Sequence, residues 1–473
     1  MRQGLQSPLL STLRCRIRLI SIFAVSLTTL LQGQSLPKAP GSQVLSLTPG
    51  TERFTEPSIA VNPANPQQIV AVFEANAHAS YSQDAGRSWK SAEGVAPADY
   101  KASGDVSTAF DKYGHAFIAY IAADKLGTFN YWGHNATRNG LFVRRSLDGG
   151  ATWEATPVVV AEHATGPGIP FEDKSYIVSD TSNSRFSGNL YVGWTRWTLT
   201  GSEILLSRST DVGQTWSTPV EIDGHPGLPR DDKGEHDGFD GTVGPDGSLY
   251  AVWADADGIA LAISRDGGKT FSPARTIIRT APLQFDLQTV TDANGFPQIA
   301  IDPRSQRLYV TWSDYRNGDV DIFCSTSTDQ GKTWSAPVRV NNDPVHNGAD
   351  QFYQWLAVDP ADGAANVIFY DRRADPENRL QTVTLARSTD GGRSFQNYAW
   401  ATEPFDSTGI FLGDYVGITA FGGRVYGVWT EKAPPTEPRD KNGSKPAEQS
   451  DKTNQPVKPG TVIKVGIADF NSR

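Results

Sequence analysis

Five acidic residues stand directly before short runs of β-branched and aromatic residues that resemble strands. Carboxylates that converge repel one another, so some of them either stay protonated at neutral pH or share a cation. Such a cluster offers a general acid for catalysis or a Ca²⁺ site. The alternative is that these side chains cap loop N–H groups or pair with arginines. The five residues are Glu56, Asp105, Asp173, Asp240 and Asp414.

Arginines form a second candidate group, because several of them closely follow an aromatic residue at the end of a strand-like run. Their guanidinium forks are suited to binding a carboxylate ligand. A structural interpretation competes with this one, because Asp314, Asp371 and Asp375 lie nearby and could pair with them. The arginines are Arg196 after Trp194, Arg316 after Trp312, and Arg372 and Arg373 after Tyr370.

Tyr415 lies beside Asp414 at the start of a strand-like segment, where a carboxylate could activate its hydroxyl as a nucleophile. Tyr353 is a rival, and for both residues a structural hydrogen bond to a buried loop is the competing interpretation. The sequence contains no zinc motif, P-loop, dinucleotide fingerprint or Gly-x-Ser-x-Gly elbow. Its 7 histidines are scattered, so we expect no histidine-based triad.

An eight-residue phrase, Ser-x-Asp-x-Gly-x-Thr/Ser-aromatic, recurs along the chain and must shape the elements that position these groups. The Asp carboxylate can accept N–H bonds within a turn, and the Gly allows the positive φ that a reversal needs. The aromatic residue begins the outgoing strand and packs beside the turn. The six copies begin at Ser82, Ser146, Ser209, Ser264, Ser327 and Ser388.

This phrase resembles the Asp-box repeat of bacterial sialidases and related β-propellers, and the copies run from Ser82 to Phe395. In that family the Asp box is a structural turn on the face away from the active site, so we expect none of these Asp residues to be catalytic. The resemblance is stronger to a group of exported sialidase-like propellers whose chemistry is largely unestablished. The segments Glu56–Pro63 and Gly413–Gly417 are similar to that group.

The resemblance to sialidases implies a Tyr nucleophile activated by a carboxylate, a carboxylic acid that donates a proton, and three arginines that clamp the substrate carboxylate. It implies Asp105 or Asp173 as the acid, and Tyr415 with Asp414 or Glu56 as the nucleophile pair. The clamp would be Arg196, Arg316 and Arg372. However, the nearest counterpart of the first arginine motif, Arg53-Phe-Thr-Glu-Pro57, departs from the sialidase order Arg-Ile-Pro.

Around each phrase the sequence predicts a unit of four short strands, which favours an all-β propeller over residues 43–473. We count seven first strands but six phrases, and the last unit lacks a fourth strand. The segment Gln43–Leu47 can supply that strand and close the ring. We therefore predict a seven-bladed propeller. The alternative is the six-bladed ring of familiar sialidases.

Two insertions interrupt the repeat. Residues 432–460 are rich in Pro, Lys, Glu, Asn and Ser, which predicts a solvated loop. Residues 121–140 carry Phe129, Tyr131, Trp132 and His134, which could stack on sugar rings or form a small core of their own. The sequon Asn135-Ala-Thr137 is expected to be unused in a bacterium.

The N-terminus predicts an exported protein. Arg14, Arg16 and Arg18 precede an apolar run, Leu19–Leu31, which is too short to span a bilayer and typical of a signal peptide. We expect cleavage after Ser35, residues 36–42 as a short linker, and a secreted or periplasmic monomer. Cys324 is then the one remaining cysteine, so we expect a buried thiol and no disulfide.

The formal net charge of −9 argues against nucleic acids and anionic membranes as partners. Two functions remain. The first is a secreted exo-glycoside hydrolase of sialidase-like type, which acts on a glycan or glycoconjugate at the mouth of the central channel. The second is a propeller that binds a glycan or a protein at the same face without catalysis. We expect no cofactor, apart from a structural Ca²⁺ ion as an alternative use of the carboxylates.

Overall fold

The structure is a computed structural model that describes residues 35–74, 77–92, 100, 102–124, 138–164, 170–229, 234–280, 283, 285–291, 293–400, 403–434 and 459–472. The predicted signal segment up to residue 34, the aromatic part of the 121–140 insertion with its sequon, and residues 435–458 of the last loop lie outside these residues. Within the described ranges no helix is long and apolar enough to cross a membrane.

The described residues form seven antiparallel sheets, each with a main path of four strands, and no α-helix. Blade 1 contains β2 (Ser58–Val61), β3 (Ile69–Phe73), β4 (His78–Ser82) and β5 (Lys90–Ala92). Blade 2 contains β6 (Ala102–Phe110), β7 (Ala116–Ala123), β8 (Asn139–Ser146) and β9 (Val158–His163). Blade 3 contains β10 (Phe171–Ser179), β11 (Leu190–Trp197), β12 (Ser202–Ser209) and β13 (Val220–Glu221).

The remaining blades repeat this order. Blade 4 contains β14 (Asp237–Val243), β15 (Leu249–Asp255), β16 (Gly258–Ser264) and β17 (Arg275–Arg279). Blade 5 contains β18 (Gln298–Asp302), β19 (Arg307–Asp314), β20 (Asp321–Ser327) and β21 (Val338–Arg339). Blade 6 contains β22 (Gln351–Val358), β23 (Ala365–Asp371), β24 (Leu380–Ser388) and β25 (Gln396–Ala399), with β26 (Phe405–Asp406) paired to β24.

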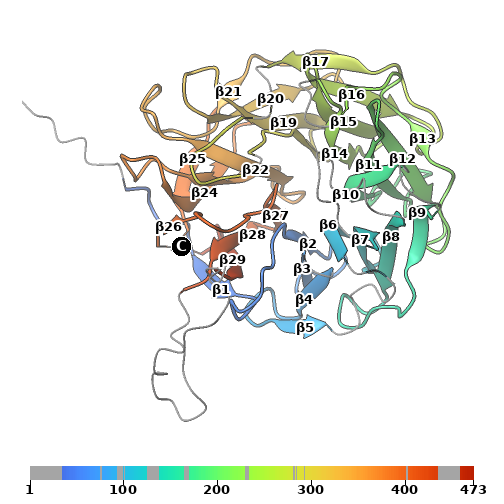
Figure 1. Cartoon of the computed structure of the whole chain (residues 1–473), viewed down its shortest axis with the longest axis horizontal. Helices are drawn as coiled ribbons and strands as arrows, with labels where there is room; N and C mark the ends of the chain where they lie inside the picture. The colour runs from blue at the N-terminus through green and yellow to red at the C-terminus, as the bar shows by residue number, and fades with distance from the viewer. Residues whose placement is uncertain are drawn as a thin grey trace, which may run out of the picture. The chain divides into compact units, whose positions relative to one another are not determined.

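Blade 7 combines the two ends of the described chain. It contains β27 (Gly417–Phe421), β28 (Arg424–Lys432) and β29 (Thr461–Asp469), and its outer strand is β1 (Gln43–Ser46). The two end strands, β1 and β29, pair antiparallel, with Gln43 opposite Ile467 and Ser46 opposite Lys464, and they lie side by side in Figure 1. The prediction of seven blades closed by this segment is confirmed.

The second strand of each blade lies between two neighbouring blades and is buried on both faces. All eight residues of β7 and all seven of β23 are buried, which explains why these strands read as continuous apolar runs. Large indoles fill the contacts between blades, and Trp194, Trp253 and Trp312 are fully buried. Cys324 is a free thiol buried in this core, and burial raises its pKa to about 12, so it is chemically inert.

The repeated phrase forms the same hydrogen-bonded turn in all six blades that contain it. In blade 5, Oδ1 of Asp329 accepts the N–H of Thr333 at 2.9 Å, and Oδ2 accepts the Thr333 hydroxyl at 2.6 Å. The N–H of Gly331 donates to Oγ of Ser327 at 2.9 Å. A Cβ on the matching Gly150 of blade 2 would come within 2.2 Å of Val70 in blade 1, so the turn also packs against the preceding blade.

Strand direction places these turns and the candidate residues on opposite faces of the ring. Each turn joins the third strand to the fourth, so it lies at the end where the first strand finishes. The residues that precede the first strands lie at the other end. Figure 1 shows these first strands, such as β2, β6, β10 and β14, around the centre of the ring.

Candidate functional site

The first strands share a common register that identifies seven equivalent positions at the mouth of the channel. In each blade we take the residue at which regular pairing with the second strand begins, counted after the bulge where the strand has one; examples are Ser58, Ser107 and Tyr176. The residue two places before it occupies the same position in every blade. These equivalent residues are Glu56, Asp105, Lys174, Gly238, Phe296, Tyr353 and Tyr415.

Five of these seven positions have a left-handed backbone. Glycine occupies one of them, Gly238, with φ 69°, but the other four carry side chains, at Glu56 (52°), Asp105 (48°), Lys174 (47°) and Tyr353 (51°). Bulges in blades 2, 3 and 6 contain Asp105, Lys174 and Tyr353. A side chain in this conformation costs on the order of 1–3 kcal/mol, and such strain is concentrated at functional sites.

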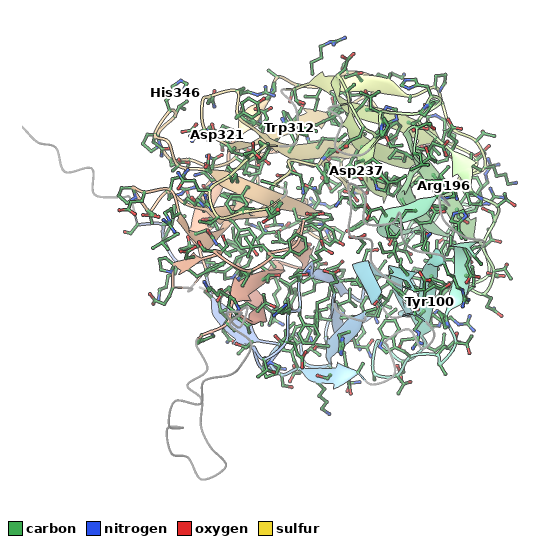
Figure 2. The ribbon with its side chains drawn as sticks, viewed as in Figure 1. Tyr100, Arg196, Asp237, Trp312, Asp321 and His346 are labelled. Atoms are coloured by element: carbon green, nitrogen blue, oxygen red, sulfur yellow. The ribbon has the colours of Figure 1, made fainter. Side chains whose placement is uncertain are left out.

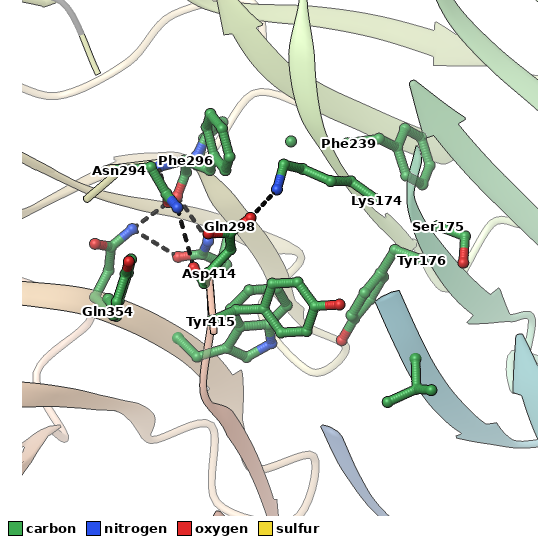
Figure 3. Close-up of a pocket in the computed structure, with 15 residues that line it drawn as sticks. Lys174, Ser175, Tyr176, Phe239, Asn294, Phe296, Gln298, Gln354, Asp414 and Tyr415 are labelled. Atoms are coloured by element: carbon green, nitrogen blue, oxygen red, sulfur yellow. Dashed lines mark hydrogen bonds and ion pairs between the residues drawn. The ribbon is translucent and has the colours of Figure 1, made fainter. Parts of the chain in front are cut away.

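A pocket opens among these positions (Figure 3). The pocket has a cavity volume of about 30 Å³, which is room for about two waters. Aromatic rings dominate the wall: the ring centroids of Tyr176 and Trp355 are 5.4 Å apart, and those of Trp355 and Tyr415 are 5.7 Å apart. Lys174, Asp414, Asn294 and Gln354 are among the polar residues that line it.

Lys174 connects the carboxylates behind this wall. Its ammonium group forms an ion pair with Asp414 (Figure 3), and its backbone N–H donates to Asp105 Oδ2 and Asp173 Oδ1, each at 3.1 Å. The hydroxyl of Tyr415 donates to the other oxygen of Asp105, Oδ1, at 3.3 Å. One residue at a strained bulge thus joins three carboxyl groups, and the phenol in the pocket is linked to the same network.

Burial changes the protonation of this cluster. Desolvation, strengthened by neighbouring carboxylates, raises the pKa of Glu56 and of Asp105 well above the ordinary range. Burial also raises the pKa of Glu74 and brings that of Asp237 to about 6. The ion pairs with the surrounding carboxylates outweigh desolvation at Lys174, whose pKa rises well above its usual value. The cluster therefore holds protons on several carboxyl groups while its lysine stays charged.

The phenol of Tyr415 stays protonated in the resting protein, because burial and then the charges of Glu56 and Asp105 raise its pKa well above the usual value. Glu56 also accepts the backbone N–H of Asp414 at 3.1 Å and so ties blade 1 to blade 7. Its neighbour Glu74 accepts the hydroxyl of Thr55 at 2.5 Å. Because the pKa of Tyr415 is raised, ionisation of this phenol requires direct transfer of its proton to a neighbouring carboxylate.

The structure brings all five predicted catalytic residues into one network: Glu56, Asp105, Asp173, Asp414 and Tyr415. Two other predicted candidates have structural partners. Asp240 accepts the N–H groups of Ile299 at 2.7 Å and Gly241 at 2.8 Å, and burial raises its pKa to about 7. The rival phenol, Tyr353, donates to the carbonyl of Thr291 at 3.2 Å.

The predicted clamp arginines are not brought to this pocket. Arg196 binds Glu172 through Nη2 at 2.6 Å, and the same carboxylate accepts the indole N–H of Trp194. Figure 2 shows Arg196 farther from the centre of the ring than Asp237. Arg316 donates from Nε to Asp314 Oδ1 at 2.8 Å, and its Nη2 also binds that carboxylate. Both guanidinium groups therefore brace a carboxylate of their own blade.

Arg372 is fully buried and serves a different contact. It donates to the carbonyl of Gln288 at 2.7 Å and to that of Asn378 at 2.9 Å. Gln288 belongs to the connection between blades 4 and 5, which also contacts the segment after β26, where the Ser407 hydroxyl donates to the carbonyl of Thr289. The clamp role of the three arginines stays a prediction. Of the three, Arg316 has the kind of partner that the structural alternative named, Asp314.

Lys174, Glu74 and Trp355 are among the residues at the site that sequence reasoning missed. Lys174 stands next to the predicted Asp173, and the bulge in β10 moves the channel-facing position from one to the other. Glu74 follows the second strand of blade 1, in the place that the arginines occupy in other blades. The signal that could have found Lys174 is alignment of the seven first strands on their paired residues.

No group of three or more His, Cys, Asp or Glu residues in the described ranges is arranged to hold a metal ion. The structural Ca²⁺ ion stays a prediction.

No protein-family profile matches the chain. Among curated proteins, a sialidase of Bacteroides fragilis is 24% identical over 167 residues. That match covers 30% of this chain and 29% of the sialidase, so the chain matches less than a third of its relative's length. The chain is a sialidase-like β-propeller.

Solved structures that resemble this sialidase-like propeller include the Hadza microbial sialidase Hz136, at 15% identity and a TM-score of 0.44, with 78% of this chain and 72% of that one covered. A protein of unknown function from Dyadobacter fermentans matches at 14% identity and a TM-score of 0.45, with 91% and 100% covered. The phage phi92 endosialidase matches at 11% identity and a TM-score of 0.48, with 91% and 69% covered.

Proposed function

We propose that this sialidase-like propeller is an exported glycoside hydrolase that cleaves glycans at the pocket around Tyr415. The observation that carries the proposal is the hydrogen bond from the Tyr415 hydroxyl to Asp105 at 3.3 Å, in a pocket walled by aromatic rings. Aromatic faces suit the stacking of a sugar ring, and a phenol bound to a carboxylate can act as a nucleophile. The sequence match to a curated sialidase supports the same reaction class.

In the proposed reaction Tyr415 attacks the anomeric carbon. Its oxygen bonds to that carbon, the bond to the leaving oxygen breaks, and the phenol proton moves to the ionised form of Asp105. Because burial and neighbouring charge raise the pKa of Asp105, its carboxylate is a stronger base than an exposed one. The leaving oxygen takes a proton from a second carboxyl of the cluster, for which Asp173 is the candidate. Water then attacks the anomeric carbon and gives one proton to the second carboxylate, while the bond to Tyr415 breaks and the phenolate recovers its proton from Asp105.

A second function has its own support. No arginine lines the pocket in the described residues. This favours a propeller that binds a glycan at the mouth without cleaving it, since a sialoside would find no clamp for its carboxylate here.

Incubation of the protein with a mixed glycan library, followed by mass spectrometry of the products, separates these functions. Hydrolysis predicts shortened glycans with a mass gain of one water, and Asp105→Asn should slow their formation roughly 10²–10⁴-fold. Asp257→Asn, which removes an exposed carboxylate paired with Arg279, is the matched control and should cleave normally. Retention of a glycan without any product would support the binding function and contradict hydrolysis.

A further inference from the structure

We propose that the pocket receives the protonated amine of an amino sugar and rejects anionic sugars such as sialic acids. This inference rests on the proposed function in one respect, namely that the pocket is where a glycan binds. It concerns which sugar enters, and it holds or fails independently of whether the sugar is then cleaved.

The charge around the pocket is the first observation. Lys174 is the one ammonium group and Asp414 the one carboxyl group among the described lining residues. Asp414, Asp237, Asp173 and Asp105 all act on its charge. Four carboxyl groups around one ammonium group favour a bound cation over a bound carboxylate.

The aromatic wall is the second observation. The faces of aromatic rings attract cations, and rings that enclose a small space form a common binding site for ammonium groups. The ammonium of Lys174 already lies 5.5 Å from the centre of the Phe296 ring, which shows that this wall accommodates such a charge. Five further aromatic residues line the same space: Tyr176, Phe239, Tyr353, Trp355 and Tyr415.

A buried acceptor without a partner is the third observation. Gln354 lines the pocket and is 2% exposed. Its amide nitrogen donates to the carbonyl of Phe296 at 2.7 Å and to Oε1 of Gln298 at 2.8 Å, which fixes the orientation of the amide (Figure 3). Its own Oε1 accepts no hydrogen bond from the described residues, and Oδ1 of Asp414 is in the same condition. An ammonium group brings three donors, one of which Oδ1 of Asp414 can accept.

The size of the pocket agrees with this ligand. An ammonium group is about as large as one water, so it fits among the residues that line the pocket. An N-acetyl group is larger and uncharged, so acetylation of the amine should remove both the fit and the charge attraction.

Calorimetric titration at pH 6.5 tests the proposal with glucosamine, galactosamine and mannosamine, their N-acetyl forms, and N-acetylneuraminic acid. At least one free amine should bind at least 10-fold more tightly than its N-acetyl form and than the acid, and its affinity should fall with added salt. Asp414→Asn and Gln354→Met should each weaken amine binding, the first by about 10-fold. Asp257→Asn should leave it unchanged.

Two results would overturn the proposal. In the first, N-acetylneuraminic acid binds at least as tightly as each of the three free amines. In the second, none of the three amines binds to the folded protein. Cleavage assays on the same preparations keep the two ideas apart. Hydrolysis of sialosides alone would sustain the proposed function and refute this specificity. Amine binding without any hydrolysis would support this specificity and contradict the proposed function.

Discussion

The hydroxyl of Tyr415 in blade 7 donates a hydrogen bond to Asp105 in blade 2 at 3.3 Å, although 310 positions separate the two residues in the sequence. The contact exists because the ring closes and brings the first strands of distant blades to one axis. It links the aromatic pocket to the buried carboxyl cluster. Closure of the propeller therefore creates the candidate site, and the stability of the ring and the chemistry of the pocket can be tested separately.

Ring closure by β1 should be essential to stability. A chain that begins at Leu47 lacks this strand, which exposes the edge of β29 and leaves its N–H and C=O groups unpaired. We expect a lower Tm by calorimetry and concentration-dependent association through the open edge. The control is a chain that begins at Gln43, which should melt higher and remain monomeric. Equal Tm values for the two chains would show that β1 contributes nothing to closure.

The turns of the repeated phrase should act on stability and leave function intact. Hydrogen bonds from Thr333 lower the pKa of Asp329 to about 2. Asp329→Ala should therefore lower Tm near neutral pH while glycan binding or turnover survives at low temperature. Because the folded-state pKa is depressed, this stabilisation is present above about pH 4 and is lost as the pH falls toward 2.

The Tm difference between the wild type and Asp329→Ala should accordingly shrink on acidification. Asp257→Ala, at an exposed position on the opposite face, is the control and should change Tm little. A folded Asp329→Ala protein with unchanged Tm and lost function would refute the structural role.

Asp240 should make the protein less stable as the pH rises. Burial raises its pKa to about 7, so the folded protein binds this proton more tightly than the unfolded chain does. The stabilising effect of the proton is complete below about pH 4 and is lost as the pH rises toward 7, with a slope of up to about 1.4 kcal/mol per pH unit. In Asp240→Asn this part of the slope should vanish. Denaturant unfolding from pH 4.5 to 8 measures it, and identical slopes in the two proteins would contradict the assignment.

The sequence was a good guide to the ring because the fold rests on local chemistry. Each repeated phrase contains the donors and acceptors of its own turn, so the turns could be predicted from the residues alone. The role of Gln43–Leu47 followed from counting strands, since the last unit lacked one. The pairing of this segment with β29 could then be predicted from the need to cover the open edge of the last sheet.

The site was harder to predict, because it depends on details of register and on contacts between blades. The bulge in β10 turns Lys174 toward the channel and leaves Asp173 beside it, a shift of one residue that the sequence pattern does not reveal. Arginines after aromatic residues suggested a ligand clamp. In Arg196 and Arg316 the same spacing instead places the guanidinium group against the carboxylate that accepts the Trp indole N–H.

The most direct test of the proposed function is the turnover of Tyr415→Phe. This substitution removes one hydroxyl, retains the ring that packs against Trp355, and leaves Asp105 without the phenol. We predict that the wild type cleaves members of a fluorogenic glycoside panel that includes amino sugars and sialosides. Tyr415→Phe should keep the wild-type Tm within a few degrees and lose measurable turnover. Cleavage by Tyr415→Phe at the wild-type rate would contradict the account, because the reaction would then take place without the hydroxyl on which the proposal rests.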